Sequence, residues 1–211
     1  MRGVEKVAGL LLAAGASTRM GRPKQLMPVS GSGLLDTVLG EALRSDLDLV
    51  NLVLGHQAQA IKKALKTDLR HPKLEVTFND QYRDGISTSI RSGLLGVEVA
   101  YDHVMIILAD MPRLTSNLIN LLLHRYSESP FSLGALQTST KRSHPVIIGR
   151  KFYPALRELR GDVGARDLFL TYPDQVLLVK TGADYDDRDI DTMDDYLDLI
   201  EGTEKKSDDG R

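Results

Sequence analysis

The sequence predicts an α/β domain built on a mostly parallel, doubly wound sheet. Two observations predict this fold class: apolar runs of strand length recur along the chain, and helical patterns lie between them. Most of the runs are continuous rather than alternating, which is typical of strands buried on both faces. Strands that alternate with helices favour a parallel sheet. The 211 residues suffice for one such domain with a sizeable core.

Each expected element has its own signal. Strands are expected at residues 7–13, 49–54, 74–78, 103–109, 132–136, 145–149 and 176–180. Residues 34–43 place their apolar side chains on one helical stripe, and residues 58–65 and 117–123 have similar patterns. Thr115 or Ser116 can cap the helix over 117–123, and Thr192 can cap a last helix that ends at about Glu201. We therefore expect a single domain over 1–201 and a polar, disordered tail over 202–211.

Composition and charge exclude several function classes. The formal net charge is −2, so no global basic field attracts nucleic acid, and an anion site must be a local cluster. Because the chain has no cysteine, thiol nucleophiles and cysteine-ligated metals are excluded, which suits the cytoplasm. No apolar run approaches the roughly 18 residues of a membrane span. The start of the chain has the charge and apolar pattern of a signal peptide, but cleavage there would remove the most regular strand.

Polar loops follow three of the expected strands. Residues 15–21 follow the first strand, residues 79–89 follow the third, and Asp110-Met111-Pro112 follows the fourth. Parallel sheets bind ligands at the carboxyl ends of their strands, so these loops should open onto one edge.

The first loop has the composition of a phosphate site but not a standard motif. It lacks G-x-G-x-x-G, and five residues separate Gly15 from Gly21, so it is not G-x-x-x-x-G-K-[ST] either. Glycine still lets backbone N–H groups approach a phosphate. Arg19 can donate hydrogen bonds to two phosphate oxygens at once, and Lys24 adds a positive charge. The alternative is a solvated basic turn.

Carboxylates supply a candidate metal site. Asp110 follows a buried strand, where a carboxylate is costly unless it is paired or bound to a metal; the alternative is a helix cap. Mg²⁺ prefers oxygen ligands and needs only one or two protein carboxylates. The second carboxylate ligand should come from residues 186–195, where Asp191 is the first choice and Asp189 the second. Most of the other acidic residues in this run are expected to form a solvated face.

The motifs "LLLAAGASTRMGRPK", "DGISTSIRSGL", "LADMP", "HPV", "GDVGAR" and "DIDTMDD" occur in an order that resembles the molybdenum cofactor nucleotidyltransferases, most closely their cytidylyltransferase branch. The resemblance spans about residues 7–199. It implies a Rossmann-like fold and the transfer of a nucleoside monophosphate from a nucleoside triphosphate to the phosphate of molybdopterin, with Mg²⁺ and release of pyrophosphate. A molybdoenzyme or its insertion chaperone would receive the product.

The resemblance also implies roles for individual residues. The nucleotide would be bound by Leu12, Ala13, Ala14, Gly15, Ser17, Arg19, Lys24, Asn79, Gly85 and Ser89. Arg19, Lys24 and Asp110 would be catalytic, with the metal on Asp110 and on Asp191 or Asp189. The pterin side would be formed by His144, Pro145, Gly161, Asp162, Gly164 and Arg166, although Ser143 stands where family members often have glycine. Taken alone, His144 and the Gly161-Asp162 pair could equally be a loop histidine and a helix start.

The sequence leaves alternatives open for the identity of the nucleotide and for that of the acceptor. The cytidine branch tends to have Ala-Ala-Gly where the guanosine branch has Ala-Gly-Gly, so Ala14 favours CTP over GTP by a single methyl group. A cytidylyltransferase for a sugar phosphate or an isoprenoid precursor shares the first loop and Asp110. A non-catalytic cofactor carrier would need no carboxylate pair. For transfer, the pterin phosphate is already anionic, so the attack requires no general base.

Overall fold

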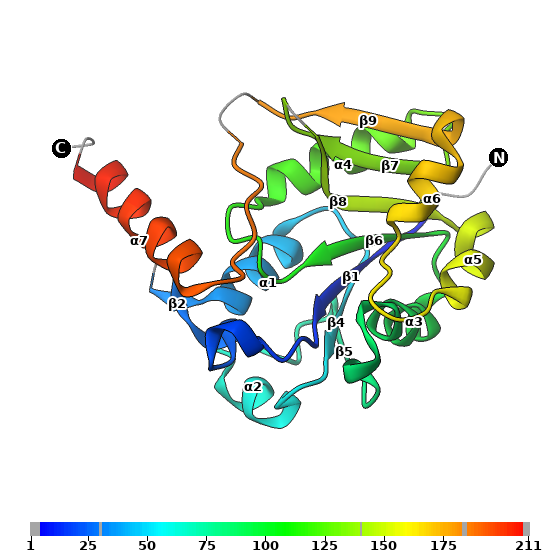
Figure 1. The fold of residues 1–211 in the computed structure, drawn as a ribbon. Helices are drawn as coiled ribbons and strands as arrows, with labels where there is room; N and C mark the ends of the chain where they lie inside the picture. Colours follow the sequence, from blue (N-terminus) through cyan, green and yellow to red (C-terminus); the bar gives the residue numbers. More distant parts are fainter. Residues whose placement is uncertain (1–4, 30, 140, 183–184, 209–211) are drawn as a thin grey trace.

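A seven-stranded sheet forms the centre of the molecule (Figure 1). In spatial order its strands are β5 (Leu74–Phe78), β4 (Leu49–Leu54), β1 (Val7–Ala13), β6 (His103–Leu108), β8 (Arg142–Gly149), β7 (Leu133–Gln137) and β9 (Val176–Lys180). The structure is a computed structural model, and it describes residues 5–29, 31–139, 141–182 and 185–208.

The expected mostly parallel sheet is confirmed, with one antiparallel strand. Strands β5, β4, β1 and β6 pair in parallel, whereas β8 runs antiparallel to both β6 and β7. The connection between β7 and β8 covers only residues 138–141. So short a connection can join only antiparallel strands, because a parallel crossover needs about a dozen residues or more.

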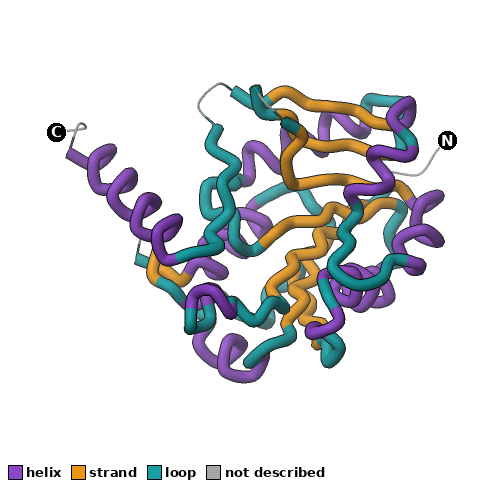
Figure 2. Tube along the Cα trace, in the orientation of Figure 1, coloured by secondary structure: helices purple, strands orange, loops and turns teal. Residues whose placement is uncertain are grey.

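Helices cover both faces of the sheet (Figures 1 and 2). One face carries α1 (Leu34–Arg44), α2 (Ala58–Ala64) and α4 (Ser116–Ser127), and the other carries α3 (Ile86–Val97), α5 (Tyr153–Glu158) and α6 (Arg166–Thr171). Successive side chains of β1 enter different cores: Leu11 belongs to the first face, and Leu10 and Leu12 belong to the second. This two-sided burial explains why the strand is continuously apolar.

Helix α3 is the main element that the sequence pattern missed. Its residues are rich in Ser, Thr and Gly, which are poor helix formers. Tertiary contacts override that preference: Gly93 lies so close to β4 that a Cβ there would stand 2.9 Å from Val53 Cγ2. The N-terminal cap of α4 is Thr115, whose hydroxyl accepts a hydrogen bond from the Leu118 amide.

The last helix, α7 (Met193–Asp208), projects from the sheet beside the two-stranded ribbon of β2 (Pro28–Val29) and β3 (Ser32–Gly33) (Figure 1). It continues past residue 201, where we expected it to end, and residues 209–211 of the expected tail lie outside the described residues. Short 3-10 turns are η1 (Thr18–Met20), η2 (Lys24–Leu26), η3 (Tyr82–Asp84), η4 (Arg150–Phe152) and η5 (Pro173–Gln175). Across the described residues, no helix has the length and apolarity that a membrane crossing requires.

Candidate functional site

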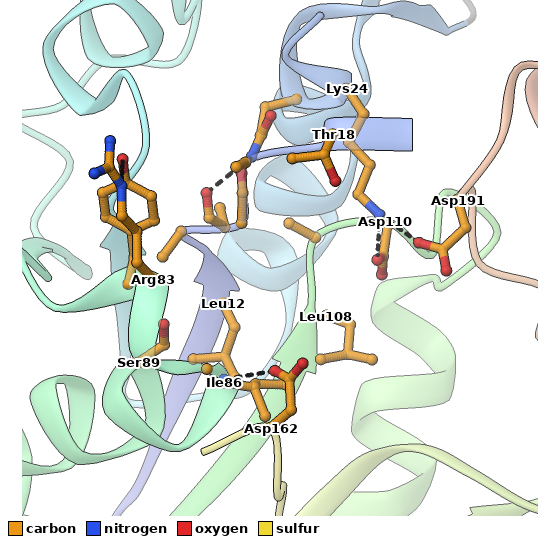
Figure 3. A pocket seen from close by; sticks show the side chains of 18 of the residues that line it. Leu12, Thr18, Lys24, Arg83, Ile86, Ser89, Leu108, Asp110, Asp162 and Asp191 are labelled. Atoms are coloured by element: carbon orange, nitrogen blue, oxygen red, sulfur yellow. Dashed lines mark hydrogen bonds and ion pairs between the residues drawn. The ribbon is translucent and has the colours of Figure 1, made fainter. Parts of the chain in front are cut away.

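A cavity of about 970 Å³, here called the main cavity, opens at the carboxyl ends of β1 and β6 (Figure 3). The three predicted loops meet there, as the parallel sheet required. The predicted site residues that line it are Leu12, Ala13, Ala14, Gly15, Arg19, Lys24, Gly85, Ser89, Asp110 and Asp191, together with Gly161 and Asp162.

The loop after β1 is held by Gln25, which the sequence analysis did not single out. The Gln25 side chain is only 3% exposed. Its Nε2 donates hydrogen bonds to the carbonyl oxygens of Ala13 (3.0 Å) and Gly15 (2.9 Å). Gln25 therefore ties the start of the loop to the η2 turn. No local pattern distinguishes this residue from an exposed polar residue, so only the fold reveals it.

Two of the predicted nucleotide contacts lie outside the lining of the main cavity. The Ser17 hydroxyl accepts a hydrogen bond from the Lys24 amide (3.2 Å), which shapes the loop. Asn79 is 3% exposed, and its Nδ2 donates to Thr88 Oγ1 (2.8 Å) and Ser89 Oγ (3.0 Å). Asn79 therefore positions the first turn of α3, including Ser89, which does line the cavity.

Lys24 lies at the centre of an acidic cluster (Figure 3). Its Nζ donates to Asp110 Oδ2 (2.8 Å), Asp191 Oδ1 (2.9 Å) and the carbonyl oxygen of Ile190 (2.9 Å). Arg19 forms an ion pair with the other oxygen of Asp191 at 2.9 Å. The first loop is thus joined to the segment before α7, although the two are far apart in the sequence.

The segment that carries Asp191 is fixed by the start of α7. Asp195 Oδ2 accepts hydrogen bonds from the amides of Asp191 (3.1 Å) and Thr192 (2.7 Å), and the Asp195 amide donates to Thr192 Oγ1 (3.2 Å). This reciprocal pair is a capping box, and it confirms Thr192 as the helix cap. The Ile190 amide also donates to the Asp110 backbone carbonyl (3.0 Å), which brings the two acidic segments together.

Local charges shift the pKa values in this cluster. Burial lowers the pKa of Lys24, but the charges and hydrogen bonds of Asp110 and Asp191 outweigh it, so this pKa lies above its ordinary value. Burial raises the pKa of Asp191, but Lys24 and Arg19 lower it by more. Burial and then the charge of Asp110 raise the pKa of Asp189. Asp189 is therefore a carboxylate whose negative charge the neighbouring cations do not offset.

The cluster has the donors that a divalent cation needs. One oxygen from each of Asp110, Asp189 and Asp191 lies within 4.8 Å of the others. Asp110 Oδ1 is buried and has no hydrogen-bond partner within the described part of the chain, which is costly for a carboxylate oxygen. Three carboxylates suit Mg²⁺ or Mn²⁺. The structure thus brings Asp110 together with both Asp191 and Asp189, which the sequence suggested as alternatives for the second ligand.

A second cavity of about 510 Å³, here called the side cavity, lies between β8 and α6. Of the predicted pterin-side residues, His144, Gly164 and Arg166 line it, whereas Pro145 does not. Arg142 also lines it, with its guanidinium 4.6 Å from the centre of the Phe169 ring. Among the described residues, neither Arg142 nor Arg166 has a carboxylate partner. The side cavity therefore presents free positive charge above an apolar floor.

His144 faces the side cavity as a neutral group. Burial lowers its pKa, even though a backbone hydrogen bond to Ile106 and the charges of Asp110 and Asp189 act in the opposite direction. Its Nδ1 is buried and has no partner among the described residues. The buried, unpartnered nitrogen is costly in this position.

A close backbone contact separates the two cavities. Gly85 has φ +99°, and a Cβ at this position would lie 2.2 Å from the Gly161 carbonyl carbon, so only glycine fits. Asp162 Oδ1 accepts a hydrogen bond from the Ile86 amide (3.3 Å; Figure 3). We expected Gly161 and Asp162 on the pterin side; they line the main cavity instead. Ile86 lines both cavities and marks where they adjoin.

Three relatives with different names align with between half and about nine tenths of the chain. Nicotine blue oxidoreductase of Paenarthrobacter nicotinovorans is 29% identical over 92% of this chain and 96% of its own. Purine catabolism protein PucB of Bacillus subtilis (strain 168) is 30% identical over 89% of this chain and 93% of its own. The molybdenum cofactor cytidylyltransferase of Escherichia coli (strain K12) is 27% identical over 50% and 52%. These names describe different activities, so similarity alone does not fix the substrate.

Solved structures and a protein family match over nearly the same range. The structure of the Rv0371c homologue from Mycobacterium sp. strain JC1 has a TM-score of 0.82 and 27% identity, covering 94% of this chain and 97% of that chain. The manganese complex of Rv0371c from Mycobacterium tuberculosis H37Rv has a TM-score of 0.76 and 26% identity, covering 93% and 98%. Residues 9–176 match the family described as "MobA-like NTP transferase domain". Because this match extends from β1 to β9, the protein belongs to the MobA-like NTP transferase family.

Proposed function

We propose that the protein transfers CMP from CTP to the phosphate of the molybdenum–molybdopterin cofactor and releases pyrophosphate. The observation that carries this proposal is the pairing of two adjoining cavities. The main cavity has a basic loop on one side and Asp110 and Asp191 on the other, and Asp189 lies beside these two carboxylates without lining the cavity. The side cavity offers two arginines that have no carboxylate partner among the described residues, together with an apolar floor, which suit an anionic ring compound.

The main cavity would hold the nucleotide. The loop after β1 would hold the triphosphate, with Arg19 forking onto phosphate oxygens and Lys24 placed beside them. Asp110, Asp189 and Asp191 would hold Mg²⁺, which would neutralise phosphate charge and orient the triphosphate. Binding of a divalent ion is supported by the manganese complex of the relative from Mycobacterium tuberculosis, and its position is supported by Asp110 Oδ1, which is buried and has no partner among the described residues.

The chemistry would be a displacement at the α-phosphorus. An oxygen of the acceptor phosphate forms a bond to that phosphorus, and the bond from phosphorus to the bridging oxygen of the β-phosphate breaks, so pyrophosphate leaves with the electron pair. The acceptor is already anionic, so no side chain has to remove a proton. Arg19 and Lys24 would stabilise the leaving pyrophosphate, and both cavities would contribute mainly by holding the reactants in line.

Choice of nucleotide would depend on Ala14, which is 4% exposed and lines the main cavity. Its methyl group narrows the space beside the base and favours cytosine over guanine. A methyl group of this kind discriminates between the two bases by about 1–3 kcal/mol.

The absence of cysteine fits an enzyme of the cytoplasm.

The test is pyrophosphate release with Mg²⁺ and molybdenum cofactor, comparing CTP with GTP and ATP. Release that requires the cofactor and is fastest with CTP is the expected result. Release with a sugar phosphate or an isoprenoid-precursor phosphate in place of the cofactor would assign a different acceptor. If the protein binds CTP but releases no pyrophosphate with any acceptor, it is a carrier rather than a transferase.

A second candidate function, that of an oxidoreductase, needs a separate experiment, because the relative from Paenarthrobacter nicotinovorans aligns over 92% of this chain. An oxidoreductase would consume NADH or NADPH with nicotine blue as acceptor. The first loop lacks the glycine fingerprint of dinucleotide folds, so we expect no reduction. Oxidation of NADH or NADPH that depends on both the protein and nicotine blue would overturn the transferase proposal.

A further inference from the structure

The Lys24 side chain points into the carboxylate cluster rather than into the open part of the main cavity (Figure 3). Its Nζ is within 2.9 Å of three oxygen atoms, from Asp110, Asp191 and the Ile190 carbonyl group. An ammonium group has three protons to donate, so these three hydrogen bonds use all of them. In this conformation, Lys24 has no donor left for a phosphate.

The partners of Lys24 are also the proposed metal ligands. Asp110 and Asp191 supply two of the three carboxylates that could hold a divalent cation. The side chains of Lys24 and Asp110 are only 16% and 20% exposed, so solvent screens this part of the cluster weakly. A divalent cation placed here would share its ligands with the ammonium group and repel it.

The charge balance leads to the same conclusion. Lys24 and Arg19 already offset two of the three carboxylate charges in the cluster. A divalent cation added while both side chains stay in place would give the cluster a net positive charge. A triphosphate brings several negative charges to the neighbouring loop, and it offers Lys24 a new partner there.

We propose that Lys24 keeps the divalent metal out of the nucleotide-free protein, and that a bound triphosphate admits the metal by drawing Lys24 off Asp110 and Asp191. This inference rests on the proposed function, in which the main cavity binds a nucleoside triphosphate. It gives Lys24 two alternating partners, carboxylates in the empty protein and phosphates in the complex. Metal and nucleotide then bind with positive coupling, which by linkage is the same in both directions.

The deciding experiment measures Mn²⁺ binding to the whole chain without nucleotide, by the loss of the free Mn²⁺ signal in electron paramagnetic resonance. The variant Lys24→Met keeps the length of the side chain and removes its charge. We expect it to bind Mn²⁺ about tenfold or more tightly than the unmodified protein. If Lys24 were only a phosphate ligand, Mn²⁺ affinity would stay the same, and if it only supported the fold, affinity would fall. Either result overturns the proposal.

Two controls locate the effect. Arg22→Met removes a positive charge from an exposed position on the same loop, and it should leave Mn²⁺ affinity unchanged. Adding Asp110→Asn to Lys24→Met should abolish the gain if Mn²⁺ binds at the cluster, and a retained gain would refute the assignment. Lys24→Gln is measured as well, so that a folding defect of the methionine variant cannot decide the outcome. Because no nucleotide is present, the measurement stands even if the pyrophosphate assay fails.

A double-mutant cycle tests the exchange of partners directly. CTP binding is measured in EDTA, where no divalent ion takes part. Asp191→Asn should strengthen CTP binding by freeing Lys24, by freeing Arg19 and by reducing repulsion. In the Lys24→Met background the contribution of Lys24 is lost and the other two remain, so the gain should be smaller. Equal gains in both backgrounds would show that the carboxylates do not compete with the triphosphate for Lys24.

Discussion

Replacing Gln25 by leucine should destabilise the protein, although Gln25 is a small part of the site. The substitution keeps a side chain of similar size, but it replaces the amide by methyl groups and removes the two N–H groups that reach Ala13 and Gly15. The carbonyl of Ala13 is in a buried bond and that of Gly15 in a partly buried one. A buried acceptor left without a partner costs about 1–3 kcal/mol, and a net hydrogen bond contributes about 1 kcal/mol. The free energy of unfolding should therefore fall by about 2–4 kcal/mol.

Urea unfolding followed by circular dichroism measures this loss. With an m-value of about 2 kcal/mol per molar, the midpoint should fall by about 1–2 M while the slope stays unchanged. Ser17→Ala is the comparison variant in the same loop: it removes the long bond to Gln25 (3.4 Å) and the bond from the Lys24 amide (3.2 Å), which are both only partly buried, so it should cost less. A Gln25→Leu variant as stable as the Ser17→Ala variant would refute the view that Gln25 ties the loop together.

Three further predictions concern the nucleotide, the metal and the helices. Asp110→Asn should reduce CTP turnover by at least about a hundredfold with an unchanged circular dichroism spectrum, since it removes a ligand charge at the reacting phosphates; normal turnover would remove Asp110 from the site. Ala14→Gly should shift the ratio of kcat/KM values towards GTP by about tenfold, within the roughly 1–3 kcal/mol of one small group, and an unchanged ratio would refute the role of this methyl. Glu41 Oε2 accepts a hydrogen bond from the Ser116 amide at the start of α4. Burial raises the pKa of Glu41, but this bond and Arg44 outweigh it, so the pKa in the folded state is below its ordinary value. The stabilisation is therefore present above about pH 4.5 and disappears as the pH falls through the folded pKa. Glu41→Gln should be less stable than the unmodified protein at pH 7, and the difference should shrink as the pH is lowered towards 3, measured by urea unfolding across this range.

The candidate site was partly predictable because some of its signals are local. Arg19, Lys24 and Asp110 follow strand ends, and the rule that parallel strands present their carboxyl ends at one edge placed them together. Gln25 carries no such signal, since its partners are carbonyl groups that only the folded loop turns towards it. Gly161 and Asp162 were expected beside the pterin, and a backbone contact with Gly85 places them in the main cavity instead.

By itself, the sequence determined the class of the fold and the order of its main elements. Continuous apolar runs require strands that are buried on both faces, and that requirement depends only on which residues are apolar. The tertiary structure decided the direction of β8, the existence of α3 and the partners of Lys24. Each of these depends on contacts between residues distant in the sequence: strand pairing, close packing of Gly93 on β4, and the approach of Asp191 to Asp110. The fold determines which charged residues pair when they are far apart in the sequence. A local pattern therefore cannot specify which carboxylate a lysine will contact.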